Sequence, residues 1–208
     1  MLRPRLIPCL LIQNNGLVKT VQFKSPKYVG DPVNAVRIFN EKLADELMII
    51  DIDATSKGID PNYERIRNLA NESRMPLCYG GGVKSIEHVE QIIQSGVEKV
   101  AVSSIAVENP EFISKAVGRV GSQSVTVVVD IKRTGVLRRH EVVTHNATKR
   151  TGLEPVSFVR SMEDLGAGEI VINSVGHDGM MKGYDLVLVK NIRTAINIPL
   201  TVLGGAGS

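Results

Sequence analysis

Short apolar runs alternate with longer amphipathic stretches along the whole chain. The apolar runs begin at Arg5, Glu46, Pro76, Lys99, Ser124, Glu169 and Pro199. They are almost continuously apolar and rich in β-branched residues, which is typical of parallel strands buried on both faces of a sheet. The stretches between them repeat their apolar positions with helical spacing. The pattern therefore predicts seven parallel strands connected by six helices.

Capping residues, prolines and glycines mark the ends of the predicted helices. Three starts place a capping side chain before a proline, which needs no amide hydrogen in the first turn. These pairs are Asp31-Pro32, Asp60-Pro61 and Asn109-Pro110. Two more helices are expected to begin after Ser85 and, with a weaker cap, at Glu154-Pro155. Gly96 and Gly166 are placed to end the helices that follow these two starts.

An internal repeat indicates how the strands are arranged. Residues 76–85, PLCYGGGVKS, align with residues 199–208, PLTVLGGAGS, at an offset of 199 − 76 = 123. The same offset places Glu46 on Glu169, and the first strand pairs with the fifth at an offset of 119. Two halves of four βα units predict an α/β protein with a (β/α)₈ TIM barrel. An open doubly wound sheet would explain neither the repeat nor the matching glycines.

The repeat also predicts the domain organisation. Residues 1–208 are expected to form a single barrel domain, with half-barrels at 1–120 and 121–208. The second half stops at Ser208, the equivalent of Ser85, where the first half continues. Strand 8 and its flanking helices are then missing, so we expect a C-terminally truncated form of a longer protein.

Composition narrows the class of partner. Apolar residues make up 43% of the chain and charged residues 23%, as in ordinary globular proteins. No apolar run approaches the ~18 residues of a membrane span, so no membrane partner is expected. A net charge of +3 without basic and aromatic tracts predicts no nucleic acid partner. Cys9 and Cys78 lie in apolar runs and are expected to be buried and reduced, which favours the cytoplasm.

Glycine-rich turns follow two strands that are half a barrel apart. They contain Gly81 and Gly82 in the first half, and Gly204 and Gly205 in the second. Backbone amides at such a strand-to-helix turn can bind phosphate. The pair therefore predicts one elongated substrate with two phosphate groups. Ser103-Ser104, after the fourth strand, is placed to help bind the first phosphate.

Four aspartates end or follow predicted strands, where a barrel carries its catalytic groups, and Asp130 is expected to end the fifth strand. Asp51 and Asp53 alternate along a strand and are expected to point the same way, toward the barrel mouth. Two carboxylates across the mouth could act as general acid and base, or could simply bind loop amides or substrate hydroxyls. Asp130 is the strongest catalytic candidate, because Lys132 shares its face and can influence its ionisation. Asp178 follows the sixth strand.

Lysine and histidine side chains add few candidates. Lys19, in a long loop after the first strand, could close over an anionic substrate or could simply be solvated. His88 is expected on a helix surface, and His140 and His145 flank a predicted hairpin. His177 stands at a strand end, where it could contact substrate. The four histidines show no metal-ligand spacing, so neither a metal nor a cofactor is expected.

The combined motifs resemble one enzyme family. They are FNEKLADELMIIDIDAT, YGGGVKS, VVVDIKR, GHDGMMKGYD and PLTVLGGAG. Over all 208 residues the chain is similar to the cyclase (HisF) subunit of imidazole glycerol phosphate synthase. The resemblance implies a lyase of histidine biosynthesis that takes ammonia from a glutaminase partner subunit. Its substrate would be a diphosphorylated ribulosyl aminoimidazole carboxamide, and its products imidazole glycerol phosphate and aminoimidazole carboxamide ribotide.

The resemblance also implies roles for individual residues. Asp130 and Lys19 would be catalytic. The substrate and phosphate positions are Asp51, Gly81, Gly82, Ser103, Ser104, Asp178, Gly179, Gly204 and Gly205. The family's charged ammonia gate falls on Arg5, Glu46, Lys99 and Glu169. These gate charges count against the related barrel isomerase of the same pathway.

The chain departs from the family at the first strand. The family's second catalytic aspartate belongs at a position that Leu11 occupies here, and leucine cannot transfer a proton. The opening PCLLIQNNGLVKT resembles second-copy (WbuZ-like) relatives associated with sugar amidation in surface polysaccharide synthesis. Three hypotheses follow from the resemblance: a cyclase, a paralogue that channels ammonia for sugar amidation, or a non-catalytic scaffold that activates the glutaminase.

Overall fold

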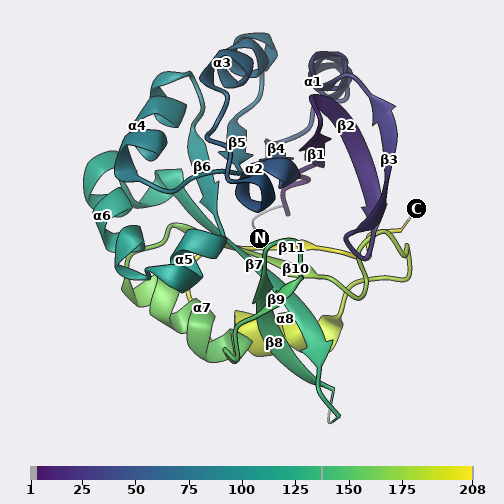
Figure 1. The fold of residues 1–208 in the computed structure, drawn as a ribbon, viewed down its shortest axis with the longest axis vertical. Coiled ribbons are helices and arrows are strands. Elements are labelled where there is room, and N and C mark those ends of the chain that lie inside the picture. Colours follow the sequence, from purple (N-terminus) through teal and green to yellow (C-terminus); the bar gives the residue numbers. More distant parts are fainter. Residues whose placement is uncertain (1–3, 137, 208) are drawn as a thin grey trace. The chain divides into compact units, whose positions relative to one another are not determined.

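The computed structural model describes residues 4–136 and 138–207, which form two compact units (Figure 1). The first unit contains residues 4–19 and 27–101. The second contains residues 20–26 and 102–207. No helix in the described residues has the length and apolar content needed to cross a membrane.

Parallel strands form the core of the first unit. In spatial order they are β6 (Lys99–Val102), β5 (Leu77–Gly80), β4 (Leu47–Asp51) and β1 (Cys9–Gln13). Leu47, Ile49 and Cys78 are fully buried, as the continuous apolar runs predicted, whereas Cys9 is only half-buried. The first strand begins at Cys9 rather than at Arg5, so the prediction placed its start four residues too early.

Helices of the first unit follow these strands in the chain, and Figure 1 shows α1, α3 and α4 on their outer side. They are α1 (Pro32–Glu41), α2 (Ile52–Lys57), α3 (Tyr63–Glu72) and α4 (Ile86–Gln94). Asp31 and Ser85 cap α1 and α4 as predicted. Helix α3 starts later than expected, because Asn62 rather than Asp60 accepts the amide hydrogen of Arg65. The short helix α2 was not predicted.

The second unit repeats the parallel arrangement. Its parallel strands are, in spatial order, β7 (Val125–Thr134), β10 (Glu169–Ser174) and β11 (Leu200–Leu203). Antiparallel strands β8 (Arg139–Thr144) and β9 (Lys149–Arg150) extend from β7. This confirms the predicted hairpin at His140, which lies on β8.

Two helices of the second unit, which begin at Glu111 and Pro155, start close to their predicted positions. The helices are α5 (Ser104–Glu108), α6 (Glu111–Val120), η1 (Ser122–Ser124), α7 (Pro155–Asp164) and α8 (Leu186–Arg193). Glu154 caps α7 by accepting two backbone amide hydrogens. At α6 the predicted cap is wrong, because Pro110 precedes the helix and no side chain accepts a capping hydrogen bond there.

The segment after β1 contains strands where a long loop was expected. These are β2 (Gly16–Val21) and β3 (Lys24–Gly30). Asn14 and Asn15 form the two-residue turn between β1 and β2, with φ of 47° and 69°. Asparagine tolerates this left-handed conformation, which matches the twist of a hairpin. Lys19 therefore lies on β2, and its prediction as a loop residue was wrong.

The pairing register reproduces the internal repeat. Leu47 lies opposite Leu77 in the first unit, and Ile170 lies opposite Leu200 in the second, each residue number being 123 higher. Leu11 lies opposite Ile50, and Asp130 opposite Asn173, so Leu11 and Asp130 are equivalent positions at the offset of 119. The seven predicted parallel strands are all present. Closure into a barrel, the half-barrel boundaries and the truncation stay predictions.

Replacing Ile66 by alanine tests the packing of the first unit. Ile66 on α3 is fully buried, so Ile66→Ala should lower the free energy of unfolding by about 2–5 kcal/mol through lost contacts and a new cavity. The control is Ile38→Ala on α1, where the side chain is 54% exposed and the expected change is within about 0.5 kcal/mol. Urea unfolding measures both variants, and equal losses would contradict the described packing.

Candidate functional site

Asp130 lies where the parallel part of the second unit ends. Its strand β7 pairs with β10 as far as Ile131 and Ser174, and then continues to Thr134 as a hairpin strand. The prediction that Asp130 ends its strand was therefore wrong, although it lies near the end of the parallel pairing. Burial and the nearby Asp178 raise the pKa of Asp130 to about 7, and a hydrogen bond from Asn173 opposes this rise. Asp130 can thus exchange a proton near neutral pH.

Asp178 belongs to a loop that the segment at 20–26 holds closely. Thr20 Oγ1 donates to Asp178 Oδ2 at 3.2 Å, and Gln22 N donates to the Asp178 carbonyl oxygen at 3.0 Å. Burial raises the pKa of Asp178 despite these donors. The backbone of Gly179 lies so near that a Cβ would be 2.3 Å from the Thr20 carbonyl oxygen. Sequence reasoning missed Thr20 and Gln22, because nothing local links them to a loop some 150 residues away.

The two glycines after β11 allow close backbone packing within the second unit. Both have positive φ, 84° at Gly204 and 112° at Gly205. A Cβ at Gly205 would lie 2.2 Å from the Gly183 carbonyl oxygen, and one at Gly204 would lie 2.8 Å from Asn173 Oδ1. These glycines are therefore needed for backbone approach whether or not they bind phosphate, so their phosphate role stays a prediction.

The first unit has a matching pair of glycines after β5. Gly81 and Gly82 have φ of 119° and 72°, and a Cβ at Gly81 would lie 2.4 Å from the Asp51 carbonyl oxygen. His88 lies in the first turn of α4, half-buried, with Nδ1 3.2 Å from the Gly82 carbonyl oxygen. Its predicted place on the surface in the middle of a helix was wrong, because the side chain folds back toward this turn.

Ser103 and Ser104 lie at the start of α5 in the second unit. Ser103 takes the N-cap position but makes no side-chain capping bond, and Ser104 is the first helical residue. His177 in the same unit contacts the Ser174 hydroxyl through Nδ1 at 2.9 Å. These positions neither establish nor exclude contact with a substrate, so both serines remain predicted phosphate ligands.

Asp51 ends β4 and starts the next helix. Its Oδ1 accepts the amide hydrogens of Asp53 and Ala54, each at 3.1 Å. The chain becomes helical at Ile52, so Asp51 and Asp53 do not alternate along a strand and that prediction was wrong. Burial raises the pKa of Asp51, although the two amides and Arg65 favour its ionised form. The carboxylate nevertheless stands at the strand end, as expected.

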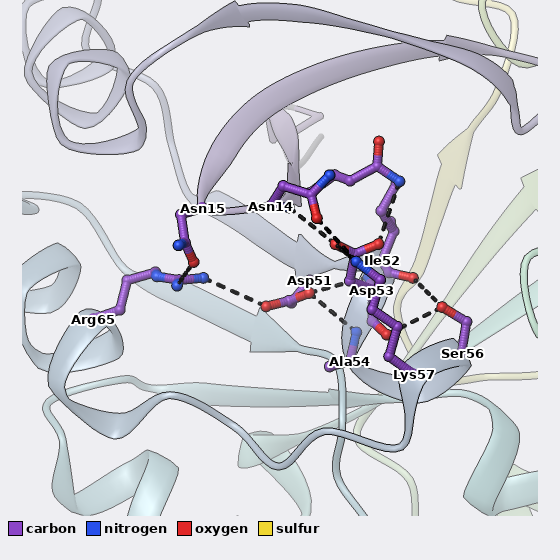
Figure 2. A network of polar contacts seen from close by, with 10 residues as sticks. Asn14, Asn15, Asp51, Ile52, Asp53, Ala54, Ser56, Lys57 and Arg65 are labelled. Atoms are coloured by element: carbon purple, nitrogen blue, oxygen red, sulfur yellow. Dashed lines mark hydrogen bonds and ion pairs between the residues drawn. The ribbon is translucent and has the colours of Figure 1, made fainter.

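Asparagines on the β1–β2 turn join this region into a polar network (Figure 2). Asp53 accepts hydrogen bonds from the Asn14 amide at 2.9 Å and from Lys57 Nζ at 2.8 Å. Arg65 donates to Asn15 Oδ1 and lies 3.5 Å from Asp51. Burial alone would raise the pKa of Asp53, but Lys57 and its other donors hold it below its usual range. Asp53 is therefore ionised at neutral pH.

A cavity of about 290 Å³ opens beside this network. Its lining residues are Asn14, Asn15, Asp51, Asp53, Ala54, Lys57, Ile59, Asp60, Asn62 and Arg65. Sequence reasoning singled out only the two aspartates at 51 and 53. The adjacent Asn14 and Asn15 were a signal of a turn, but their partners on α2 and α3 are visible only in the fold. No group of three or more potential metal ligands occurs within residues 4–136 and 138–207.

Three of the four predicted gate residues meet in the first unit. Glu46 is only 2% exposed and directly precedes β4. Arg5 Nη1 lies 2.8 Å from Glu46 Oε2, and Lys99 Nζ lies 2.7 Å from the same oxygen. Glu169 is buried in the second unit, where it accepts a hydrogen bond from Thr201 Oγ1 at 2.6 Å. The first unit thus contains a buried carboxylate held between two cations.

Comparisons with known proteins agree on one family. The model of the family described as "Histidine biosynthesis protein" matches residues 5–208. A Leptospira borgpetersenii protein, provisionally named imidazole glycerol phosphate synthase subunit HisF, is 56% identical over this whole chain and 82% of its own length. Relatives provisionally named subunits hisF3 of Vibrio vulnificus and hisF2 of Pseudomonas aeruginosa are 51% and 47% identical. They match over 100% of this chain and 80% and 82% of their own lengths.

Both the family model and the relatives extend over both compact units. The chain therefore belongs to the histidine biosynthesis protein family, and its relatives include proteins named as HisF subunits of imidazole glycerol phosphate synthase.

Proposed function

We propose that this chain is a cyclase subunit that uses ammonia from a glutaminase partner. It would convert a diphosphorylated ribulosyl aminoimidazole carboxamide to imidazole glycerol phosphate and aminoimidazole carboxamide ribotide. The observation that carries this proposal is Asp130, a carboxyl group with a pKa of about 7 beside Asp178 at the end of the parallel strands. A group with this pKa is suited to general acid and base catalysis at neutral pH.

Asp130 acts as the general base in this proposal. Its ionised form removes a proton during ring closure, and its protonated form can return one, because its pKa is about 7. Lys19, exposed on β2, binds an anionic group of the substrate. Asp51, Asp178 and Gly179 orient the substrate. One phosphate group is assigned to Gly81, Gly82, Ser103 and Ser104, and the other to Gly204 and Gly205.

Ammonia would enter past the charged group around Glu46. The support is the buried Glu46 carboxylate, which forms ion pairs with the exposed Arg5 and with Lys99. Glu169 completes the gate in this proposal. The names of the relatives as subunits of a synthase support a glutaminase partner. Cytoplasmic location follows from this pathway.

A second candidate function rests on Leu11. This half-buried leucine occupies the position on β1 that Asp130 occupies on β7, and it faces the apolar Ile50 across the strand pair. The nearby Asp53 is a poor substitute acid, because its pKa is held below its usual range. The chain would then pass ammonia to a sugar-modifying enzyme of surface polysaccharide synthesis without closing a ring, or would only activate the glutaminase. The names hisF3 and hisF2 of two relatives fit the presence of additional HisF copies in this family.

Replacing Asp130 by asparagine tests the proposed base. Asp130→Asn should lower turnover with ammonium salts by about 10²–10⁴-fold, because the amide cannot accept the proton. The wild-type rate should rise as pH increases through about 7, as Asp130 ionises. Product formation by the whole protein measures both effects. Asp164→Asn, at an exposed position on α7, is the matched control, and an equal loss there would contradict a specific role for Asp130.

Replacing Leu11 by aspartate separates the two candidate functions. If the missing carboxylate limits ring closure, Leu11→Asp should raise turnover by about 10²–10⁴-fold, and Leu11→Asn, of the same shape, should not. Wild-type turnover equal to that of Leu11→Asp would show that the cyclase needs no acid at this strand. A folded Leu11→Asp protein that forms no product with ammonium would instead favour ammonia transfer or glutaminase activation.

Burial of Asp130 also predicts a pH-dependent stability. Its folded pKa of about 7 lies above the usual 3.8, so the folded protein loses stability as pH rises through this window. Asp130→Asn should therefore be more stable than the wild type at about pH 8, and the gain should shrink toward about pH 4. Urea unfolding across this range measures it, and a gain that does not change with pH would contradict the raised pKa.

A further inference from the structure

Asp51 uses only one of its two carboxylate oxygens inside the first unit. Its Oδ1 accepts the amide hydrogens of Asp53 and Ala54, each at 3.1 Å, and so caps α2. Its Oδ2 accepts no hydrogen bond from the part of the chain that the structure describes, and Arg65 Nη1 lies 3.5 Å from it. This distance makes an ion pair but is too long for a good hydrogen bond. Oδ2 can therefore still accept a hydrogen bond from a ligand.

The Asp51 side chain can be reached from the cavity beside the polar network. Asp51 and Arg65 are both among the residues that line this cavity. Their side chains are 14% and 22% exposed, so neither is sealed off from small polar molecules. An ionised carboxylate only accepts hydrogen bonds, which selects a ligand group that donates, and Asp53 and Asp60 on the same wall disfavour an anion. The wall around Asp51 thus suits a hydroxyl group.

Arg65 is held between the end of β4 and the β1–β2 turn (Figure 2). It lies in the first turn of α3, and its guanidinium donates through Nη2 to Asn15 Oδ1 while Nη1 lies toward Asp51. A guanidinium is a rigid, planar group, so holding one nitrogen restricts where the other can lie. Asn15 therefore fixes the position of the cation beside Asp51.

Arg65 also counteracts the burial of Asp51. Burial raises the pKa of Asp51, the capping amides and Arg65 lower it, and the negative charge of Asp53 adds to the rise. Lys57, the other cation at the cavity, is paired with Asp53 at 2.8 Å. Tyr79 on β5 is buried, and both burial and Asp51 raise the pKa of its hydroxyl, so it stays neutral. Among the described residues that act on Asp51, Arg65 is the cation that favours its ionised form.

We propose that Arg65 is a positioning residue for Asp51: anchored by Asn15, its guanidinium keeps the carboxylate ionised and fixed at the cavity, where Oδ2 accepts a hydroxyl group of the substrate. The hydroxyl part rests on the proposed function, in which the substrate carries a ribulosyl chain and Asp51 orients it. The action of Arg65 on Asp51 does not, because it concerns only side chains of the folded protein.

Variants of Arg65 test its action on Asp51. Arg65→Gln removes the cation, so the pKa of Asp51 should rise by about one pH unit, followed at its carboxyl carbon by NMR titration of the whole, ¹³C-labelled protein. Arg65→Lys keeps a charge and should raise this pKa clearly less. Arg67→Gln, at an exposed position on the same helix, is the matched control and should leave it unchanged. No rise in Arg65→Gln, or the same rise in either of the other variants, would overturn the proposal.

Variants of the turn test whether Asn15 anchors Arg65. Asn14 and Asn15 both have left-handed φ, which glycine adopts readily, so glycine preserves the turn at either position. Asn15→Gly removes the oxygen that Arg65 binds, and the pKa of Asp51 should rise as it does in Arg65→Gln. Asn14→Gly removes the oxygen that Lys57 binds instead, and is the matched control. Equal pKa values of Asp51 in the two variants would contradict the anchoring role of Asn15.

Binding of the diphosphorylated carboxamide substrate tests the hydroxyl part. Calorimetry on the whole protein at about pH 8 gives the Kd, and Arg65→Gln should raise it by about fivefold or more, because the acceptor at Asp51 is displaced. Arg67→Gln should leave the Kd unchanged. An unaltered Kd in Arg65→Gln would overturn the hydroxyl part of the proposal.

A double-mutant cycle separates positioning from direct contact between Arg65 and the substrate. In an Asp51→Asn background, Arg65→Gln should change the Kd by less than about twofold, because Arg65 acts through Asp51. The same loss of affinity in both backgrounds would show that Arg65 itself binds the substrate, and the positioning role would be wrong. If the wild type binds no substrate, the proposed function fails, while the NMR titration still decides whether Arg65 acts on Asp51.

Discussion

The register of the parallel strand pairs is the constraint on which the candidate site depends. Backbone hydrogen bonds fix which residues face each other, and every strand-end side chain takes its place from that pairing. The register repeats between the units, so Leu11 opposite Ile50 corresponds to Asp130 opposite Asn173. A slip by one residue would turn these side chains to the other face of the sheet. The chemistry of the site therefore rests on the apolar strands that hold this register.

Removal from water sets the properties of the acidic groups. Asp130 and Asp178 have raised pKa values because burial outweighs the donors near them. Asp53 shows the opposite balance, since Lys57 and the β1–β2 turn supply enough donors to keep it ionised. These carboxyl groups thus differ in their tendency to ionise because their burial and their donors differ. Such a division is what acid and base catalysis requires.

Much of the framework could be predicted from the sequence. Seven strands, the caps at Asp31, Ser85 and Glu154, and the 123-residue repeat all follow from local patterns, and the structure contains them. The predictions failed where a short segment could adopt more than one secondary structure. The chain turns into helix directly after Asp51, which no strand periodicity reveals, and the expected loop around Lys19 pairs as strands.

The sequence by itself determined the strands, the repeat, the family and the absence of an acid at Leu11, because each is encoded in neighbouring residues or in a fixed spacing. Only the tertiary structure decided which side chains from distant parts of the chain lie next to one another. It brings Thr20 to Asp178, Arg5 and Lys99 to Glu46, and Asn173 to Asp130. These pairings, and the loss of water that shifts the pKa of Asp130, arise from contacts between distant segments. No local pattern in the chain records them.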